Sequence, residues 1–332
     1  MKKVCLYVLL CGLFSGCTKP QPLVIKDFEI YLSRKNDIAE KLVKIILEAR
    51  KEVLLTTYEA NLPCVLSALA EAQRRGVKVA LLLDDQTLPE CPLPPTETYT
   101  DHNPNYLMHT KFGVVDGKIS WLGSFNLTFS SAYQSDNDLI FFHSPEVSSY
   151  LRKAFYVLKS GREPSSLKKK NVPVKIYFTP KCQSALLEEL ESAQKKIFFS
   201  LYVLTDPKVI NLLQRKARTG VKVSGVLERS WEGNKKAFDD LRLSGINVSW
   251  DQNYHLNHYK VFIIDEKEVI TGSYNPSLAA TRNQEILAII DDPTVALFYR
   301  CHLSPLPDPL HFNLQGDPYS CMPAPVDSKQ GF

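Results

Sequence analysis

Residues 109–126 read HTKFGVVDGKISWLGSFN, and residues 258–275 read HYKVFIIDEKEVITGSYN. Both stretches contain His-x-Lys, then Asp, then Gly-Ser-x-Asn, with four residues between Lys and Asp and six between Asp and Gly. Chance is a poor explanation for identical gaps at two places in one chain. The repeat therefore predicts a duplicated unit, in which each copy contributes half of one active site.

The segments before the two copies repeat as well, in the order strand, helix, strand, helix, strand. Both halves also contain Gly-Val-Lys-Val, at residues 76–79 and 220–223. Strands that alternate with helices predict a mostly parallel, layered α/β architecture in each half. The expected segments are 28–32, 38–49, 53–58, 65–75 and 76–83 in the first half, and 174–178, 184–194, 197–203, 209–218 and 220–223 in the second. A Pro-rich insert at 91–95 replaces a helix expected near 234–243 in the second half.

The motif side chains suit a phosphate group. His and Lys are two residues apart in each copy, as are Ser and Asn, so on extended backbone each pair projects from one face. Lys supplies charge, Ser and Asn supply hydrogen bonds, and His can attack phosphorus or transfer a proton. The candidate residues are His109, Lys111, Ser124 and Asn126 in the first copy, and His258, Lys260, Ser273 and Asn275 in the second.

The acidic residues fall into two groups. Asp116 and Asp265 come five residues after their Lys, on the opposite strand face, so we expect them to support the following turn. Asp138 in the first half and Glu285 in the second are better carboxylate partners for the imidazoles of their own halves. A carboxylate on one ring nitrogen fixes the tautomer and stabilises the imidazolium.

These residues resemble the phospholipase D superfamily, whose pattern is H-x-K-x4-D-x6-G-S-x-N in two copies, and the likeness extends from about Phe28 to Cys301. It implies two tandem phospholipase D-like α/β sandwich halves related by pseudo-twofold symmetry, in a monomer. It also implies that His109 forms a phosphohistidine and that His258 is the acid and then the base, with no metal or organic cofactor. Asp138 departs from the family pattern, which more often has Glu there.

The first residues predict export. Lys2 and Lys3 precede an apolar run, Val4–Phe14, that is too short to span a bilayer, and Ser15-Gly16-Cys17 resembles a bacterial lipobox. We therefore expect a signal peptide at 1–16 and a lipid-anchored protein on a bacterial membrane, with Thr18 resembling lipoproteins of the outer membrane. An ordinary secretory leader remains the alternative.

The remaining boundaries follow from composition. We expect a tether at 17–26 after lipidated Cys17, a first half at 27–160, a linker at 161–172, a second half at 173–301 and a Pro-rich tail at 302–332. We expect a disulfide between Cys301 and Cys321, with Cys64 and Cys91 as a second candidate pair. No cysteine has metal-ligand spacing, so no metal site is expected.

Composition leaves the substrate open. With 332 residues, 44% hydrophobic and 23% charged, the chain is globular, and its net charge of +4, or +2 without Lys2 and Lys3, does not require a polyanionic partner. A phospholipid membrane is the expected partner. The alternatives are an exported nuclease, with Lys168–Lys170 and Arg74-Arg75 as contacts to the nucleic-acid backbone, and a non-catalytic surface binding protein on the same fold.

Overall fold

The computed structural model describes residues 21–303, except residues 26, 34, 88–96, 102–104, 170–171 and 173. The expected signal peptide, Cys17, the Pro-rich insert and nearly all of the C-terminal tail lie outside the described residues. No helix among the described residues is long and apolar enough to cross a membrane.

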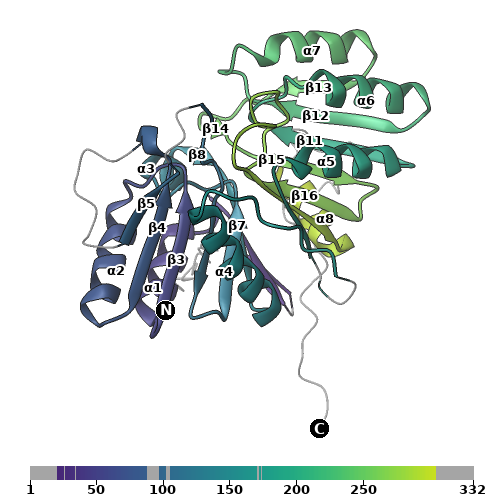
Figure 1. The fold of residues 1–332 in the computed structure, drawn as a ribbon. Helices are drawn as coiled ribbons and strands as arrows, with labels where there is room; N and C mark the ends of the chain where they lie inside the picture. Colours follow the sequence, from purple (N-terminus) through teal and green to yellow (C-terminus); the bar gives the residue numbers. More distant parts are fainter. Residues whose placement is uncertain are drawn as a thin grey trace, which may run out of the picture.

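Two sheets, one in each half of the chain, form the framework (Figure 1). The first has the order β1-β2-β9-β7-β6-β3-β4-β5, and the second has the order β10-β17-β16-β15-β11-β12-β13. The first sheet contains β1 (Leu23–Ile25), β2 (Phe28–Leu32), β3 (Glu52–Thr57), β4 (Lys78–Leu83), β5 (Glu97–Thr100), β6 (Phe112–Val115), β7 (Ile119–Gly123) and β9 (Asp138–Phe142). The second contains β10 (Val174–Phe178), β11 (Lys196–Leu201), β12 (Lys222–Leu227), β13 (Asn247–Trp250), β15 (Lys260–Ile264), β16 (Glu268–Gly272) and β17 (Ile286–Asp291).

Several helices begin at a residue whose side chain caps the first turn. Asp37 accepts a hydrogen bond from the Glu40 N–H at the start of α1, and Ser144 accepts one from Val147 at the start of α4. The helices are α1 (Ile38–Glu48), α2 (Pro63–Arg74), α3 (Phe129–Tyr133), α4 (Pro145–Lys159), α5 (Lys181–Ser192), α6 (Pro207–Arg218), α7 (Asn234–Leu243) and α8 (Pro293–Leu303), with a short 3₁₀ turn at Asp85–Thr87. The helix expected near 234–243 is therefore present.

The expectation of mostly parallel sheets is wrong, because both sheets are mixed. Within these two sheets, the parallel pairs are those of β3-β4-β5 and of β11-β12-β13. The motif strands form antiparallel hairpins, β6-β7 and β15-β16, because Asp116 and Asp265 reverse the chain in turns too short for a crossover connection. The strand-helix order correctly predicted the first part of each half but not these hairpins.

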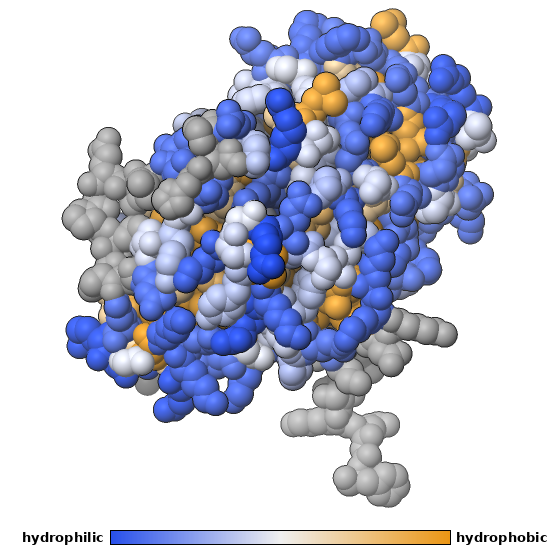
Figure 2. All heavy atoms as spheres, viewed as in Figure 1, coloured by the Kyte–Doolittle hydropathy of each residue, from blue (hydrophilic) through white to orange (hydrophobic). Residues whose placement is uncertain are grey.

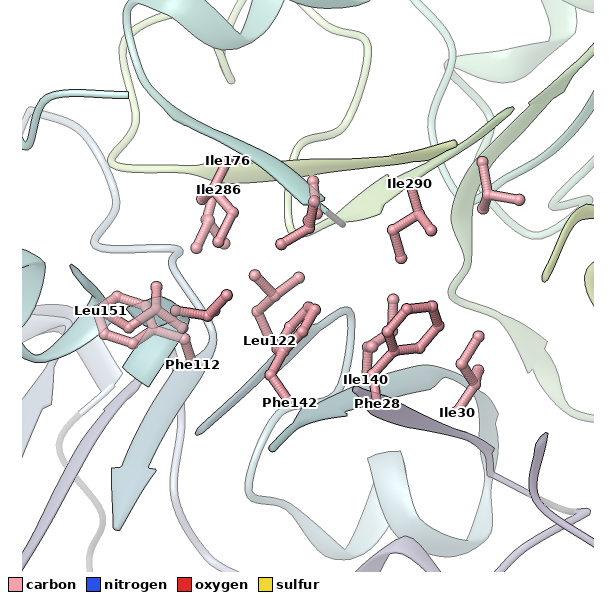
Figure 3. Packing of buried hydrophobic residues seen from close by; sticks show 14 of the residues in the cluster. Phe28, Ile30, Phe112, Leu122, Ile140, Phe142, Leu151, Ile176, Ile286 and Ile290 are labelled. Carbon is pink, nitrogen blue, oxygen red and sulfur yellow. The ribbon is translucent and has the colours of Figure 1, made fainter. Parts of the chain in front are cut away.

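Three hydrophobic cores lie between the layers. One lies between the first sheet and α1 and α2, and another lies between the second sheet and α5, α6 and α7. The third core contains residues of both sheets together with α4 and α8. Figure 3 shows Ile176, Ile286 and Ile290 of the second sheet facing Leu122 and Phe142 of the first. The two halves therefore share one buried apolar interface.

Regular elements lie within or next to the segments expected to connect or follow the two halves. The segment expected as a tether contains β1, which pairs with β2, and α8 continues to Leu303. Cys301 is disulfide-bonded, with a partner outside the described residues, whereas Cys64 is a free thiol, so the Cys64–Cys91 pairing is wrong. Within the expected linker, Leu167 is buried and forms a bridge to Ile176 of β10.

Candidate active site

The two His-x-Lys segments cross over to the opposite half. The N–H of His109 donates to the carbonyl of Gln284 at 2.9 Å, and the N–H of His258 donates to the carbonyl of Asp136 at 2.9 Å. The second contact extends a two-stranded ladder between β14 (Leu256–Asn257) and β8 (Ser135–Asp136). Backbone pairing therefore carries each histidine to the residues that follow the Gly-Ser-x-Asn motif of the other half.

Glu285 is the partner of His109, not of His258. The Nδ1 atom of His109 lies 2.9 and 2.8 Å from the two carboxylate oxygens of Glu285, which is fully buried. The expectation that each carboxylate holds the imidazole of its own half is therefore wrong, because the His-x-Lys segments pair across the interface. With Nδ1–H donating to Glu285, the Nε2 atom of His109 keeps its lone pair.

An amide, not a carboxylate, holds His258. Its Nδ1 atom lies 2.7 Å from Oδ1 of Asn137, and Nδ2 of Asn137 donates to the carbonyl of Ser131 at 3.2 Å. The second bond fixes the orientation of the amide, so its oxygen must face the imidazole. The proton of neutral His258 therefore lies on Nδ1.

Asn137 is the structural counterpart of Glu285. In the sheet ladders Gly123 pairs with Leu139 and Gly272 pairs with Leu287, which places Asn137 and Glu285 two residues before equivalent positions. Their N–H groups also donate to equivalent hydroxyls, Asn137 to Ser33 Oγ and Glu285 to Thr179 Oγ1. The sequence alignment of Asp138 with Glu285 was displaced by one residue.

Asp138 instead joins the two halves. Its side chain is completely buried and accepts from Ser124 Oγ at 2.8 Å in its own half. Its other oxygen accepts from Thr271 Oγ1 and the Tyr299 hydroxyl, both at 2.6 Å and both in the second half. Among the hydrogen bonds of the described residues, neither imidazole bonds this carboxylate. Burial and the Asp138 charge raise the pKa of Tyr299 well above its usual value.

Two buried lysines lie beside the imidazoles. Lys111 Nζ donates to the carbonyl of His109 at 2.7 Å, and Lys260 Nζ donates to the carbonyl of His258 at 2.8 Å. Burial lowers the pKa of Lys111 to about 7, although Glu285 opposes this. Burial, and then the charge of Lys111, holds the pKa of Lys260 well below its usual value. This concentration of positive charge favours an anion.

Burial lowers the pKa of both histidines. For His109 the Glu285 charge opposes burial, whereas for His258 the charges of Lys260 and Lys111 add to it and hold its pKa well below the usual value. These mutual effects link groups from both copies of the motif. The structure thus brings the two copies into one charged centre.

A pair of tyrosines was missed in the sequence. The Tyr58 ring lies 5.5 Å from the His109 ring, and the Tyr202 ring lies 4.9 Å from the His258 ring. Each ring also lies near the lysine of the same half, at 5.7 Å for Lys111 and 5.0 Å for Lys260. The available signal was a Tyr immediately after the equivalent strands β3 and β11.

The predicted phosphate-binding residues differ in their contacts. Ser124 donates to Asp138 and Ser273 donates to Glu285, so both hydroxyls hold carboxylates. The buried Oδ1 atoms of Asn126 and Asn275 have no hydrogen-bond partner among the described residues. The two amides therefore retain hydrogen-bonding capacity.

Asp116 and Asp265 lie in the turns after the motif strands, at φ values of 55° and 51°. Asp116 accepts from the N–H groups of residues 50–52 and Asp265 from those of residues 194–196, all within 2.7 to 3.0 Å. These contacts match the turn-supporting position that strand parity predicts.

Among the described residues, one acidic group has the spacing of a metal site. Ligand atoms of Asp84, Asp85 and Asp101 lie within 4.8 Å of one another. Asp84, however, already accepts from the N–H groups of Gln86 and Met108, which positions the segment before His109. Burial, with Asp84 and Asp85, raises the pKa of Asp101 to about 6.

The comparisons with known proteins agree with the duplicated arrangement of the chain. Residues 42–159 and 186–305 each match a domain family described as cardiolipin synthase, PLD-like domain. The chain is 36% identical over 128 residues to phospholipase D of Rickettsia typhi, covering 37% of this chain and 62% of that protein. It is 31% identical over 118 residues to human mitochondrial cardiolipin hydrolase, covering 35% of this chain and 47% of that protein. The structure of Haemophilus influenzae phosphatidylserine synthase has the same fold, with a TM-score of 0.67, 12% identity and coverage of 85% and 86% of the two chains.

Proposed function

Because the chain belongs to the phospholipase D superfamily, with two phospholipase D-like domains in one polypeptide, we propose that it hydrolyses glycerophospholipid headgroups through a phosphohistidine intermediate. The observation that carries the proposal is that each imidazole is held by a residue of the opposite half. His109 and His258 are each fixed through Nδ1 by the opposite half, and both lie beside the lysine pair.

In the proposed first step, Nε2 of His109 attacks phosphorus and the bond to the leaving alcohol breaks. The alcohol oxygen takes the proton from Nε2 of protonated His258. Glu285 stabilises the positive charge that develops on the His109 ring. In the second step, water gives a proton to His258 and its oxygen displaces His109 from phosphorus, which restores both residues. A primary alcohol in place of water would give transphosphatidylation.

The phosphate contacts come from the buried cations and amides. Lys111 and Lys260 compensate the charge of the phosphodiester, and the side-chain Nδ2–H groups of Asn126 and Asn275 donate to its oxygens. Since the serine hydroxyls are bonded to carboxylates, we now assign them to the support of those carboxylates. The four cationic and amide groups remain in the phosphate-binding role that the sequence suggested.

A lipid surface as the source of substrate is supported by exposed apolar side chains next to the motifs. Phe129 and Tyr133 of α3 follow Asn126, with ring centroids 4.9 Å apart. Tyr254, which is 98% exposed, shortly precedes His258, and its loop contacts the end of α3 through Leu256. Figure 2 shows a largely hydrophilic face with small hydrophobic patches. Exposed aromatic side chains close to the motifs suit a headgroup and acyl boundary.

The localisation forms part of the proposal. A lipid-anchored Cys17 would hold the enzyme at a bacterial membrane, in agreement with a phospholipid substrate. Metabolic labelling with palmitate should mark the wild-type protein and not the Cys17→Ser variant. Unlabelled wild-type protein would contradict the anchor while leaving the catalytic proposal intact.

The activity test compares phosphatidylcholine, cardiolipin and plasmid DNA as substrates in EDTA. We expect headgroup release from lipid vesicles and none of it with His109→Asn. Cleavage of DNA alone would overturn the lipid assignment in favour of a nuclease, and inactivity on all substrates would favour a binding protein. Phosphate trapped on His258 instead of His109 would reverse the assignment of the two histidines.

The exposed aromatic side chains can be tested separately from the chemistry. Tyr254→Ser and Phe129→Ser should reduce hydrolysis of vesicles severalfold but leave hydrolysis of bis(4-nitrophenyl) phosphate unchanged. Leu243→Ser is the matched control, because Leu243 is 87% exposed at the end of α7, away from the motifs. Equal vesicle activity in all three variants would contradict a lipid-contacting role.

A further inference from the structure

The two histidines differ in the residue that holds them. Equivalent backbone positions place Glu285 against His109 and Asn137 against His258. The two hydrogen bonds have similar lengths, 2.8 and 2.7 Å, so the two histidines differ in the charge of their partner and not in its distance. A carboxylate stabilises an imidazolium, whereas an amide orients the ring without adding a negative charge.

We infer that Asn137 is the positioning residue of His258, and that its amide, in place of the carboxylate of the other half, makes His258 the proton carrier and leaves His109 as the nucleophile. This inference rests on the proposed function. The attacking imidazole acquires a lasting positive charge in the phosphohistidine, which Glu285 offsets. The acid must instead release its proton, and a ring without a carboxylate partner releases it more readily.

His258 is buried among positive charges, so a partner that adds no negative charge affects how readily the ring loses its proton. Burial comes first in holding its pKa well below the usual value, followed by the charges of Lys260, Lys111 and His109, with the Ser124 backbone opposing them. The other titratable groups packed around this centre are Tyr202, Glu285, Asp138, Asp136 and Glu228. None of these carboxylates bonds the His258 ring. Among the described residues, Asn137 is therefore the side chain that hydrogen-bonds this ring.

Two substitutions separate orientation from charge. Asn137→Asp keeps the shape and adds a carboxylate, so the NMR titration midpoint of His258 should rise by about one pH unit or more. The alkaline limb of bis(4-nitrophenyl) phosphate hydrolysis should move to higher pH with it. Asn137→Ala removes the acceptor, and the rate should fall by about 10- to 100-fold as part of the acid contribution is lost.

Leaving groups provide the readout that a merely structural role would not change. The loss in Asn137→Ala should be larger with diphenyl phosphate than with bis(4-nitrophenyl) phosphate, because phenoxide needs protonation more than nitrophenoxide does. Glu285→Gln, which acts on the nucleophile, should reduce both rates alike. Asn211→Asp makes the same chemical change at an exposed site on α6 and should leave both rates at the wild-type value.

The outcomes distinguish this inference from the proposed function. A His258 midpoint that is unchanged in Asn137→Asp, or equal losses on the two diesters in Asn137→Ala, would overturn the inference. Failure on phospholipids with turnover of both diesters would overturn the lipid assignment alone. If no diester is hydrolysed, the phosphodiesterase proposal falls, and the NMR midpoint still decides the role of Asn137.

Discussion

Glu285 and Asn137 show how one side-chain group differentiates two otherwise equivalent histidines. Each residue is buried and bonds Nδ1 of an imidazole from the opposite half. Each also comes directly after the residue whose carbonyl accepts from the N–H of that histidine. Carboxylate and amide bond the same ring nitrogen but carry a different charge. Residue-level predictions therefore concern charge at a fixed geometry.

Glu285→Gln tests the carboxylate on the proposed nucleophile. We expect a loss of kcat of about 100-fold or more, because the amide no longer stabilises the imidazolium and can impose the wrong tautomer. The pKa of His109 should fall, since the Glu285 charge is the main influence opposing burial. Single-turnover kinetics should place the loss in the formation of the phosphoenzyme, and normal kcat in this variant would contradict the assignment.

Lys111 predicts a pH-dependent affinity for phosphodiesters. Below its pKa of about 7 the side chain is charged, and as pH rises through that value the unliganded protein loses this charge. The affinity for dimethyl phosphate, whose own charge stays constant, should therefore fall at higher pH, by up to about tenfold per unit. Calorimetry at pH 6 and pH 8 measures the change. Lys111→Met should bind weakly at both values, and a pH-independent wild-type affinity would exclude this explanation.

At the level of elements, the two motif hairpins depend on their aspartates. Asp116 closes the turn after β6 and accepts from the N–H groups of residues 50–52 at the start of β3. Asp265 does the same with residues 194–196 at the start of β11. The aspartates thereby fix the register of the motif strand against its neighbour. Their repeated spacing within the chain reflects support of the motif strands, not chemistry.

Asp116→Ala should reduce the free energy of unfolding by about 2–3 kcal/mol, because three backbone donors lose a charged acceptor. Chemical denaturation measures this loss. The folded fraction should retain its activity on bis(4-nitrophenyl) phosphate. Lys118→Ala, in the same turn, is the control and should change stability by less than about 0.5 kcal/mol. Inactivity of the folded Asp116→Ala protein would instead place Asp116 in the chemistry.

The sequence supported the elements better than their pairing. Hydrophobic periodicity located β2, α1 and β10 to within a residue or two, because their apolar faces are buried in regular patterns. Periodicity does not specify strand direction, so the mixed sheets were missed. The exchange of partners between halves depends on contacts across more than 100 residues, such as His109 with Glu285, which no local pattern encodes.

At the level of the whole molecule, the shared core and the buried Asp138 join the halves. Ile286 and Ile290 pack against the first sheet, and Thr271 and Tyr299 bond Asp138 across the interface. Neither sheet can bury its inner face alone. The same interface aligns the exchanged site residues, so stability and catalysis depend on one surface.

Both halves should therefore unfold in one cooperative transition. Trp121 reports on the first sheet, and Trp231 with Trp250 reports on the second half. Two variants, Trp121→Phe and the double Trp231→Phe, Trp250→Phe, each leave fluorescence in one half only. In each variant the unfolding midpoint from fluorescence should equal the midpoint from far-UV circular dichroism. Between the variants, the midpoints should differ only by the destabilisation that each substitution causes. Two transitions within one variant would show that the halves unfold independently.

The exchange of partners between halves also has an evolutionary consequence. In an assembly of two identical half-chains, one codon would specify the residue that holds both imidazoles, so any substitution would strike both at once. Fusion into one polypeptide gives the two positions separate codons. Asn137 and Glu285 can then diverge independently, and a symmetric ancestor of such a fold can acquire two specialised histidines without passing through a form in which both are altered.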